Sequence, residues 1–223
     1  PLYAAATLAG AVWLGRTSVP EPRQPGRAAG LADCFRLLKN RTVLLCALGI
    51  ACFIAADVAI GFMAVRLIDA PDSILTTTGF YACRIVGTLG GAWVLTRRSD
   101  VKYLGANMAV ALVATGLLLW LRAAVAVYVV VGVLGFAMAC VFAPFFAVAT
   151  KAEPERGNEV SGLMILAISA GALSGPVCGA LIRWTGGVQW GLLFPAVCIA
   201  YMLWASFALR RNPMNGRYKD TER

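Results

Sequence analysis

Residues 42–68 read TVLLCALGIACFIAADVAIGFMAVRLI, and Asp57 and Arg66 are the only charged residues among these 27. An α-helix needs about 20 apolar residues to cross the hydrocarbon core of a bilayer, so this stretch is long enough to span a membrane. Runs of similar length and composition follow it along the chain. Six membrane-spanning helices are therefore predicted, over residues 42–68, 74–96, 103–121, 125–150, 160–183 and 190–209.

The composition of the whole chain of 223 residues agrees with lipid as its solvent. Hydrophobic residues make up 60% and charged residues 14%, against about 45–50% and about 25% in soluble domains. This excludes an ordinary cytosolic enzyme, a disordered chain and a disulfide-stapled secreted module. The chain has no His, and its seven cysteines show no C-x-x-C spacing. We therefore predict no enzyme activity, no metal site and no cofactor.

The basic residues predict the orientation. Sixteen of the 20 Lys and Arg residues fall on one side of the predicted spans, three fall on the other side, and Arg84 lies within a span. Cytoplasmic loops of membrane proteins carry such an excess, so the C-terminus is predicted to be cytoplasmic. The net charge of +9 is explained in the same way, and we expect the lipid bilayer rather than nucleic acid as a partner.

The chain divides into four segments. Residues 1–15 are predicted to be the end of a truncated transmembrane helix, 16–41 a cytoplasmic linker, 42–209 the six-helix bundle, and 210–223 a cytoplasmic tail. Within the linker, residues 31–41 place Leu31, Cys34, Phe35 and Leu38 on one face of a short amphipathic helix. This helix is either a latch between two halves of a transporter or a surface anchor, and the pattern fits both.

The six spans form two units of three, 42–121 and 125–209, which are inserted in opposite directions; such inverted units are typical of transporters. The second helix of each unit carries small residues, which allow close helix packing in lipid. We expect these helices to pack against a second half of the protein through Gly87, Gly91, Gly171, Gly175 and Gly179. Proline bends a helix, and helix kinks are predicted at Pro144 and Pro176.

Two opposite charges lie deep in neighbouring spans. Asp57 is 11 residues and Arg84 is 10 residues from the same membrane side, so their depths differ by about 1.5 Å. A charge at the bilayer centre costs roughly 2.5–3.5 kcal/mol on insertion scales and needs a partner or a role. We predict an ion pair between these two residues, either in a substrate cavity or as a purely structural contact.

A polar stripe surrounds the predicted pair. Thr77, Tyr81, Arg84 and Thr88 are spaced by four, three and four residues and share one helix face, while Phe53 lies one turn before Asp57. Charged and hydroxyl groups can hydrogen-bond the hydroxyls of a sugar, and an aromatic ring can contact its C–H face. The predicted substrate-binding residues are therefore Phe53, Asp57, Thr77, Tyr81, Arg84 and Thr88.

Four stretches carry a family resemblance: FIAADVAIGFMAVRLI (53–68), FYACRIVGTLGGAWVLTRRSD (80–100), APFFAVATK (143–151) and VSGLMILAISAGALSGPVCGALIRWTG (160–186). They resemble the C-terminal half of a sugar transporter of the major facilitator superfamily, of the fucose permease and glucose/galactose transporter type. Arg84, in R-x-x-G-T, is the most specific element of the match. The loop T-R-R-S-D-V-K (96–102) departs from the superfamily's signature, and Asp57 replaces a neutral amide of fucose permeases.

The resemblance implies an all-α membrane protein of the bacterial inner membrane that lacks the N-terminal half of a twelve-helix transporter. It implies sugar transport by alternating access, with proton coupling through carboxylates of the missing half. Two alternatives remain open. One is an exporter of drugs or other small metabolites with the same fold, and the other is a non-transporting membrane scaffold.

The charge distribution generates a prediction about topology. On a background without the seven native cysteines, a cysteine at position 187 should react with an impermeant maleimide added to intact cells. Cysteines at positions 100 and 218 should react only after the cells are lysed. Labelling of position 218 from outside would reverse the predicted orientation.

Overall fold

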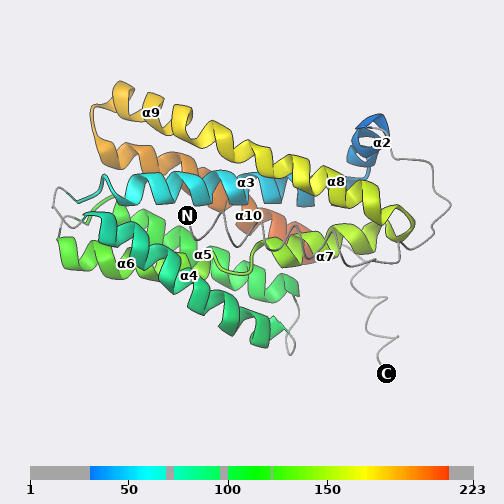
Figure 1. Cartoon of the computed structure of the whole chain (residues 1–223), viewed down its shortest axis with the longest axis horizontal. Coiled ribbons are helices and arrows are strands. Elements are labelled where there is room, and N and C mark those ends of the chain that lie inside the picture. Colours follow the sequence, from blue (N-terminus) through cyan, green and yellow to red (C-terminus); the bar gives the residue numbers. More distant parts are fainter. Residues whose placement is uncertain (1–30, 69–72, 96–99, 122, 211–223) are drawn as a thin grey trace, which may run out of the picture.

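The computed structural model describes residues 31–68, 73–95, 100–121 and 123–210. These residues are almost entirely helical, and the long helices run roughly along one axis of the molecule (Figure 1). The elements are α2 (Leu31–Arg36), η1 (Leu37–Lys39), α3 (Arg41–Ala64), α4 (Ser73–Leu95), α5 (Asp100–Leu118), α6 (Ala124–Ala137), α7 (Phe142–Ala152), η2 (Pro154–Arg156), α8 (Gly157–Ile168), η3 (Ser169–Leu173), α9 (Ser174–Thr185), η4 (Val188–Leu192) and α10 (Leu193–Arg210).

Five of the helical segments in the described residues are long and apolar enough to cross a membrane. They are Arg41–Ala64, Val101–Leu118, Ala124–Ala152, Pro154–Thr185 and Val188–Arg210. Helix α4 lies where the second of the six spans, 74–96, was predicted and has 23 residues, but its threonines and Arg84 lower its hydropathy. The predicted segments 1–15 and 210–223 fall outside the described residues, apart from Arg210, which ends α10.

The second helix of each three-helix unit packs against the first helix of the other unit. In the first unit (α3, α4, α5), α4 packs mainly on α6, the first helix of the second unit. In the second unit, the segment α8–η3–α9 packs on α3, the first helix of the first unit. The third helices α5 and α10 pack against each other, and each also contacts the first helix of the other unit. This reciprocal pattern is what two inverted, interleaved units require.

Glycines allow close approach at these two contacts between the units. A Cβ atom added at Gly135 of α6 would overlap the main-chain oxygen of Phe80 in α4, and one at Gly87 would lie 2.8 Å from the Cβ of Ala139. On the other side of the bundle, a Cβ at Gly171 would lie 2.8 Å from Ile54 of α3. Helix backbones therefore approach each other closely at both crossings, as small residues allow in lipid.

This corrects part of the prediction for the glycines. Gly87, Gly91 and Gly171 are buried inside the chain, where Gly91 faces Tyr103 and Cys140. The sequence pattern indicates a close contact but not its partner. Here the partner is the other three-helix unit of the same chain. Gly175 and Gly179 have no atom within 4 Å of an added Cβ, so their packing on a second half stays a prediction.

The predicted kinks prove to be helix interruptions. Pro144 is the third residue of α7, and the turn before it contains Cys140 with a φ of 54°. Pro176 is the third residue of α9, directly after the 3₁₀ segment η3. Proline is tolerated in the first turn of a helix, where its missing N–H is not needed. Each proline therefore begins the second half of a broken span.

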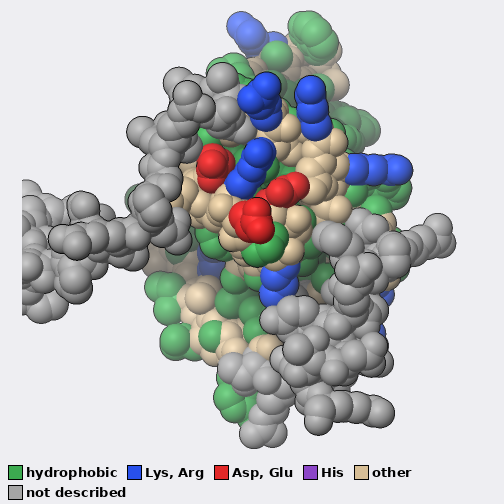
Figure 2. Space-filling model, turned by 90° about the vertical axis from the view of Figure 1, so that its right-hand side faces the viewer, with side chains coloured by type: hydrophobic (Ala, Val, Ile, Leu, Met, Phe, Trp, Pro, Cys, Tyr) green, Lys and Arg blue, Asp and Glu red, His purple; other side chains and the backbone are tan. Residues whose placement is uncertain are grey.

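Polar caps and charges gather at one end of the bundle. Asn40 caps α3 by accepting a hydrogen bond from the Thr42 N–H at 3.0 Å, and its amide donates to Glu153, after α7, at 2.9 Å. Helix α2 occupies the position of the predicted amphipathic helix and contacts α8 at this end. Figure 2 shows acidic side chains near the centre of the end face, with Lys and Arg side chains around them. This is the end that was predicted to face the cytoplasm.

The close crossing of α4 and α6 generates a second prediction. Gly135→Ala should lower the midpoint of thermal unfolding of the detergent-purified protein, because overpacking of a tight contact costs about 1–3 kcal/mol. Gly116→Ala is the matched control, since nothing lies within 4 Å of an added Cβ there. The control should be neutral or gain up to about 1 kcal/mol from helix propensity. Equal effects of the two substitutions would contradict the close crossing.

Candidate functional site

The site is built on the crossing of α3 and α4. Arg84, near the middle of α4, donates from Nη1 to Oδ1 of Asp57 on α3, so the structure confirms the predicted ion pair. The side chain of Asp57 is 13% exposed and that of Arg84 is 23% exposed. Asp57 is the only buried charged residue in the part of the chain that the structure describes. Because a buried charge without a partner is strongly destabilising, each residue stabilises the other in the bundle.

The ring of Phe53 also contacts the guanidinium group of Arg84. It lies one turn before Asp57 on α3 and is buried, and the centroid of its ring is 5.3 Å from Cζ of Arg84. A cation over an aromatic face is attracted by the ring quadrupole, more strongly where water is excluded. Phe53, Asp57 and Arg84 thus form one fixed cluster, as the sequence predicted.

Tyr81 and Thr77 extend this cluster along the helix crossing. The hydroxyl of Tyr81 lies over Gly61 of α3, where an added Cβ would be only 2.8 Å from it. Oγ1 of Thr77 donates to the main-chain oxygen of Gly61 at 3.3 Å. The absence of a side chain at Gly61 therefore lets α4 place a phenol and a hydroxyl beside the charged pair. Tyr81 remains 42% exposed, so part of this residue is open to a ligand.

Thr88 belongs to a different contact. Its Oγ1 donates to the main-chain oxygen of Arg84 at 2.9 Å, within the same helix, and the residue is exposed. Its main-chain oxygen accepts a hydrogen bond from Sγ of Cys140 at 3.3 Å. Of the six predicted substrate-binding residues, Thr88 is the one that the structure does not bring to the Asp57–Arg84 pair.

Sequence reasoning missed Cys140 as part of this region. Its left-handed backbone conformation is unusual for a residue with a side chain, and it ends the turn that connects α6 to α7. The only signal in the sequence is Pro144, four residues later, whose nitrogen cannot bond to the main-chain oxygen of Cys140. The turn brings this broken span against α4, one helical turn from Arg84.

The cluster has the chemistry of a polar recognition site rather than of a catalytic one. It offers carboxylate acceptors, guanidinium donors, a phenol and an aromatic face, and the charges of Asp57 and Arg84 cancel. In the described residues, no group of three or more Cys, Asp or Glu side chains could hold a metal ion. The arrangement fits a neutral ligand with many hydroxyl groups.

Comparison with solved structures identifies the architecture. The chain superimposes on the major facilitator superfamily transporter FucP in its outward conformation with a TM-score of 0.77 and 19% sequence identity, over 91% of this chain and 51% of FucP. A variant of the same E. coli protein, named as a fucose:proton symporter, matches equally well. The chain has the fold of one half of a major facilitator transporter.

Curated relatives agree with this major facilitator fold. A putative glucose/galactose transporter of Helicobacter pylori is 26% identical over 184 residues, which cover 78% of this chain and 44% of the relative. A glucose/galactose transporter of Brucella abortus is 25% identical over 170 residues. The chain thus spans less than half the length of these relatives. They are membrane transporters rather than enzymes, and the resemblance to such sugar transporters is confirmed, although no protein-family model matches the chain.

The contact between Tyr81 and Gly61 generates a third prediction. In the complete protein, Gly61→Ala should weaken the binding of a hydroxyl-bearing ligand at this site about two- to tenfold, because it displaces the hydroxyl of Tyr81 and removes the hydrogen bond of about 0.5–1.5 kcal/mol that this hydroxyl can make to the ligand. Gly79→Ala is the control, since an added Cβ meets nothing within 4 Å there.

A second variant tests whether Gly61→Ala acts through the hydroxyl of Tyr81. In Tyr81→Phe, the hydroxyl that an added Cβ at Gly61 would displace is already gone, so the further change Gly61→Ala should alter the ligand affinity little. An undiminished effect of Gly61→Ala in that background would show that Gly61 acts on something other than Tyr81.

Proposed function

We propose that this chain is the C-terminal half of a secondary active transporter that moves a small sugar across the bacterial inner membrane, coupled to protons, by alternating access. The observation that carries the proposal is the Asp57–Arg84 pair, which is partly exposed beside Phe53 and Tyr81 at the crossing of two helices. The names of the curated relatives support a sugar as the substrate.

In the proposed mechanism, the neutral pair provides both hydrogen-bond donors and acceptors to the hydroxyls of the sugar. Arg84 retains free N–H groups beside the one bound to Asp57, and Asp57 retains lone pairs on both oxygens. Tyr81 adds a hydroxyl that can donate and accept. The charges of Asp57 and Arg84 cancel, which favours a neutral sugar over an ion, because the charge of a bound ion would have no counter-charge in the site.

The other half of the cavity belongs to a second bundle in this proposal. The segment α8–η3–α9 is the least buried of the candidate spans, with 17% of its apolar window covered. It also carries Gly175 and Gly179, beside which there is open space. These features favour the N-terminal half of the same protein as the partner of this surface. Rocking of the two halves around the Asp57–Arg84 pair would expose the site to each side in turn.

The charged pair provides the experiment that tests the function. In the complete transporter, Asp57→Asn and Arg84→Gln should each reduce uptake of the labelled monosaccharide by at least about a hundredfold, because each change leaves one buried charge without its partner. Uptake is measured in cells after the amount of inserted protein has been equalised. Wild-type uptake by both variants would show that transport does not need the pair and would reduce it to a structural contact or less.

The double variant Asp57→Arg with Arg84→Asp separates recognition from structure. It keeps an ion pair across the same crossing but exchanges the positions of donors and acceptors. If the two residues bind the sugar, the double variant should insert normally and remain inactive. Restored uptake would mean that only mutual neutralisation matters.

The proposal of a missing half generates a further prediction. Residues 1–223 alone should insert into membranes but show no saturable sugar uptake in vesicles, because one wall of the cavity is absent. Co-expression with the N-terminal half as a separate chain should restore uptake. Saturable transport by residues 1–223 alone would instead indicate a homodimer of six-helix chains.

A further inference from the structure

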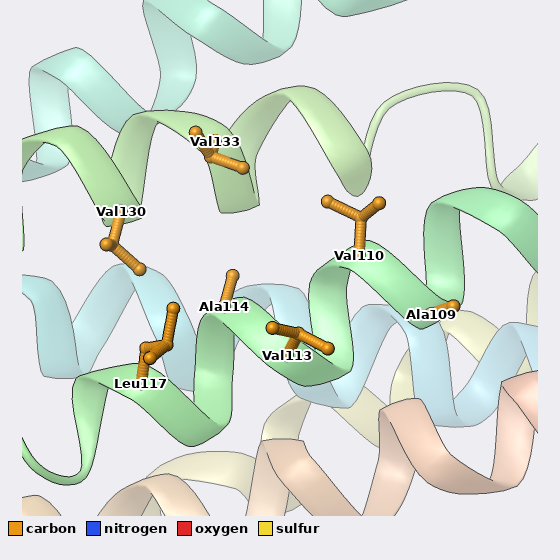
Figure 3. Close-up of a pocket in the computed structure, with 7 residues that line it drawn as sticks. All are labelled: Ala109, Val110, Val113, Ala114, Leu117, Val130 and Val133. Atoms are coloured by element: carbon orange, nitrogen blue, oxygen red, sulfur yellow. The ribbon is translucent and has the colours of Figure 1, made fainter.

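A groove separate from the charged pair lies between α5 and α6. Five residues of α5 and two of α6 line a cavity of about 390 Å³. They are Ala109, Val110, Val113, Ala114, Leu117, Val130 and Val133. Figure 3 shows Ala114 and Val110 pointing from α5 toward α6, with Val130 and Val133 opposite. The small side chain of Ala114, which is 4% exposed, forms the floor of the groove, while Val113 and Leu117 remain 64% and 48% exposed on the rim.

We propose that this groove binds one acyl chain of a membrane lipid. All seven lining side chains are aliphatic, so nothing in the groove can hydrogen-bond a polar ligand. Both helices belong to segments that are long and apolar enough to cross a membrane. The groove therefore opens toward hydrocarbon, whose chains have the same chemistry as its walls.

The dimensions of the groove fit a single chain in a single leaflet. From Ala109 to Leu117, α5 rises by about 12 Å at about 1.5 Å per residue, which is a little under half of a hydrocarbon core about 30 Å thick. Benzene, with six carbon atoms, binds in a cavity of about 150 Å³. At the same density, a volume of about 390 Å³ is more than enough for the part of one acyl chain that runs along this length of α5.

Trp120 marks where the headgroup of this lipid lies. It follows Leu117 by three residues, just beyond the end of α5, and its side chain is 85% exposed. Tryptophan is enriched at the membrane–water interface. A chain that enters beside Trp120 and runs along Leu117, Val113 and Val110 therefore starts at headgroup level and ends near the bilayer centre.

The groove by itself is smaller than a stable protein–protein interface. Stable protein–protein interfaces use about 20–30 residues on each side, whereas seven residues line this groove. A lipid chain needs no larger contact, because neighbouring lipids cover the rest of the helix surface. The groove is thus a site where one lipid is held longer than its neighbours.

The test uses phosphatidylethanolamine with a diazirine in the middle of one acyl chain, incorporated into membranes that contain the complete protein. After photolysis, mass spectrometry maps the modified residues. We expect Val113, Leu117 and Val133 to be labelled about fivefold more than Val197 and Phe207, which are exposed on α10 outside the groove. That factor corresponds to burying one to two more methylene groups of the lipid.

Filling the groove provides the matched comparison. Ala114→Leu should reduce the excess labelling of Leu117 and Val133 about fivefold, whereas Ala200→Leu, on the exposed side of α10, should leave it unchanged. The mapping of the unsubstituted protein stands even if Ala114→Leu does not fold. Uniform labelling of α5, α6 and α10 would overturn the proposal. Protection of the groove by a crosslinked second copy or another protein would also overturn it.

Discussion

The structure depends on placing two opposite charges together at the same depth in an apolar bundle. Asp57 and Arg84 form one ion pair between α3 and α4, and neither residue could remain in this environment alone. The pair fixes the rotation of both helices about their axes. Since the side chain of Phe53 and the glycine at position 61 lie on the same face of α3 as Asp57, the rotation that pairs the charges also presents the aromatic ring and positions Tyr81.

The packing of each unit's second helix on the other unit leaves this pair accessible to a ligand. Helix α3 contacts α7, the α8–η3–α9 segment and α10, so most of its remaining surface is covered. Helix α4 is anchored on its far side by α6, through the close approach of Gly135 to Phe80. The charged face is thus held between two rigid contacts while Tyr81 stays partly exposed. Broken spans at Cys140 and at η3 lie beside this arrangement, where a change in helix direction requires little loss of regular hydrogen bonding.

The sequence predicts the helices and the ion pair because both follow from local rules. The length of an apolar run determines whether it can span a bilayer, and the distance of Asp57 and Arg84 from the span ends places them at one depth. The stripe of Thr77, Tyr81 and Arg84 follows from helical spacing alone. These features need no knowledge of the tertiary contacts.

The remaining features depend on tertiary contacts that a single sequence does not contain. A glycine such as Gly87 indicates a close approach, but only the fold shows that α6 covers it rather than a second half of the protein. Thr88 shares the helix face of Arg84, yet its hydroxyl bonds to its own helix. The groove at Ala114 forms between aliphatic residues of two separate helices, α5 and α6, and has no signature in either one.

The central claim is that the Asp57–Arg84 pair lines the site where substrate binds, and chemical protection tests it most directly. A cysteine introduced at Tyr81, which is 42% exposed beside the pair, is reacted with a maleimide in the complete, otherwise cysteine-free transporter. We expect the transported sugar to slow this labelling with the same concentration dependence as uptake, and a non-transported sugar to have no effect. Labelling that stays unchanged at saturating sugar, in a variant that still transports, would contradict this claim.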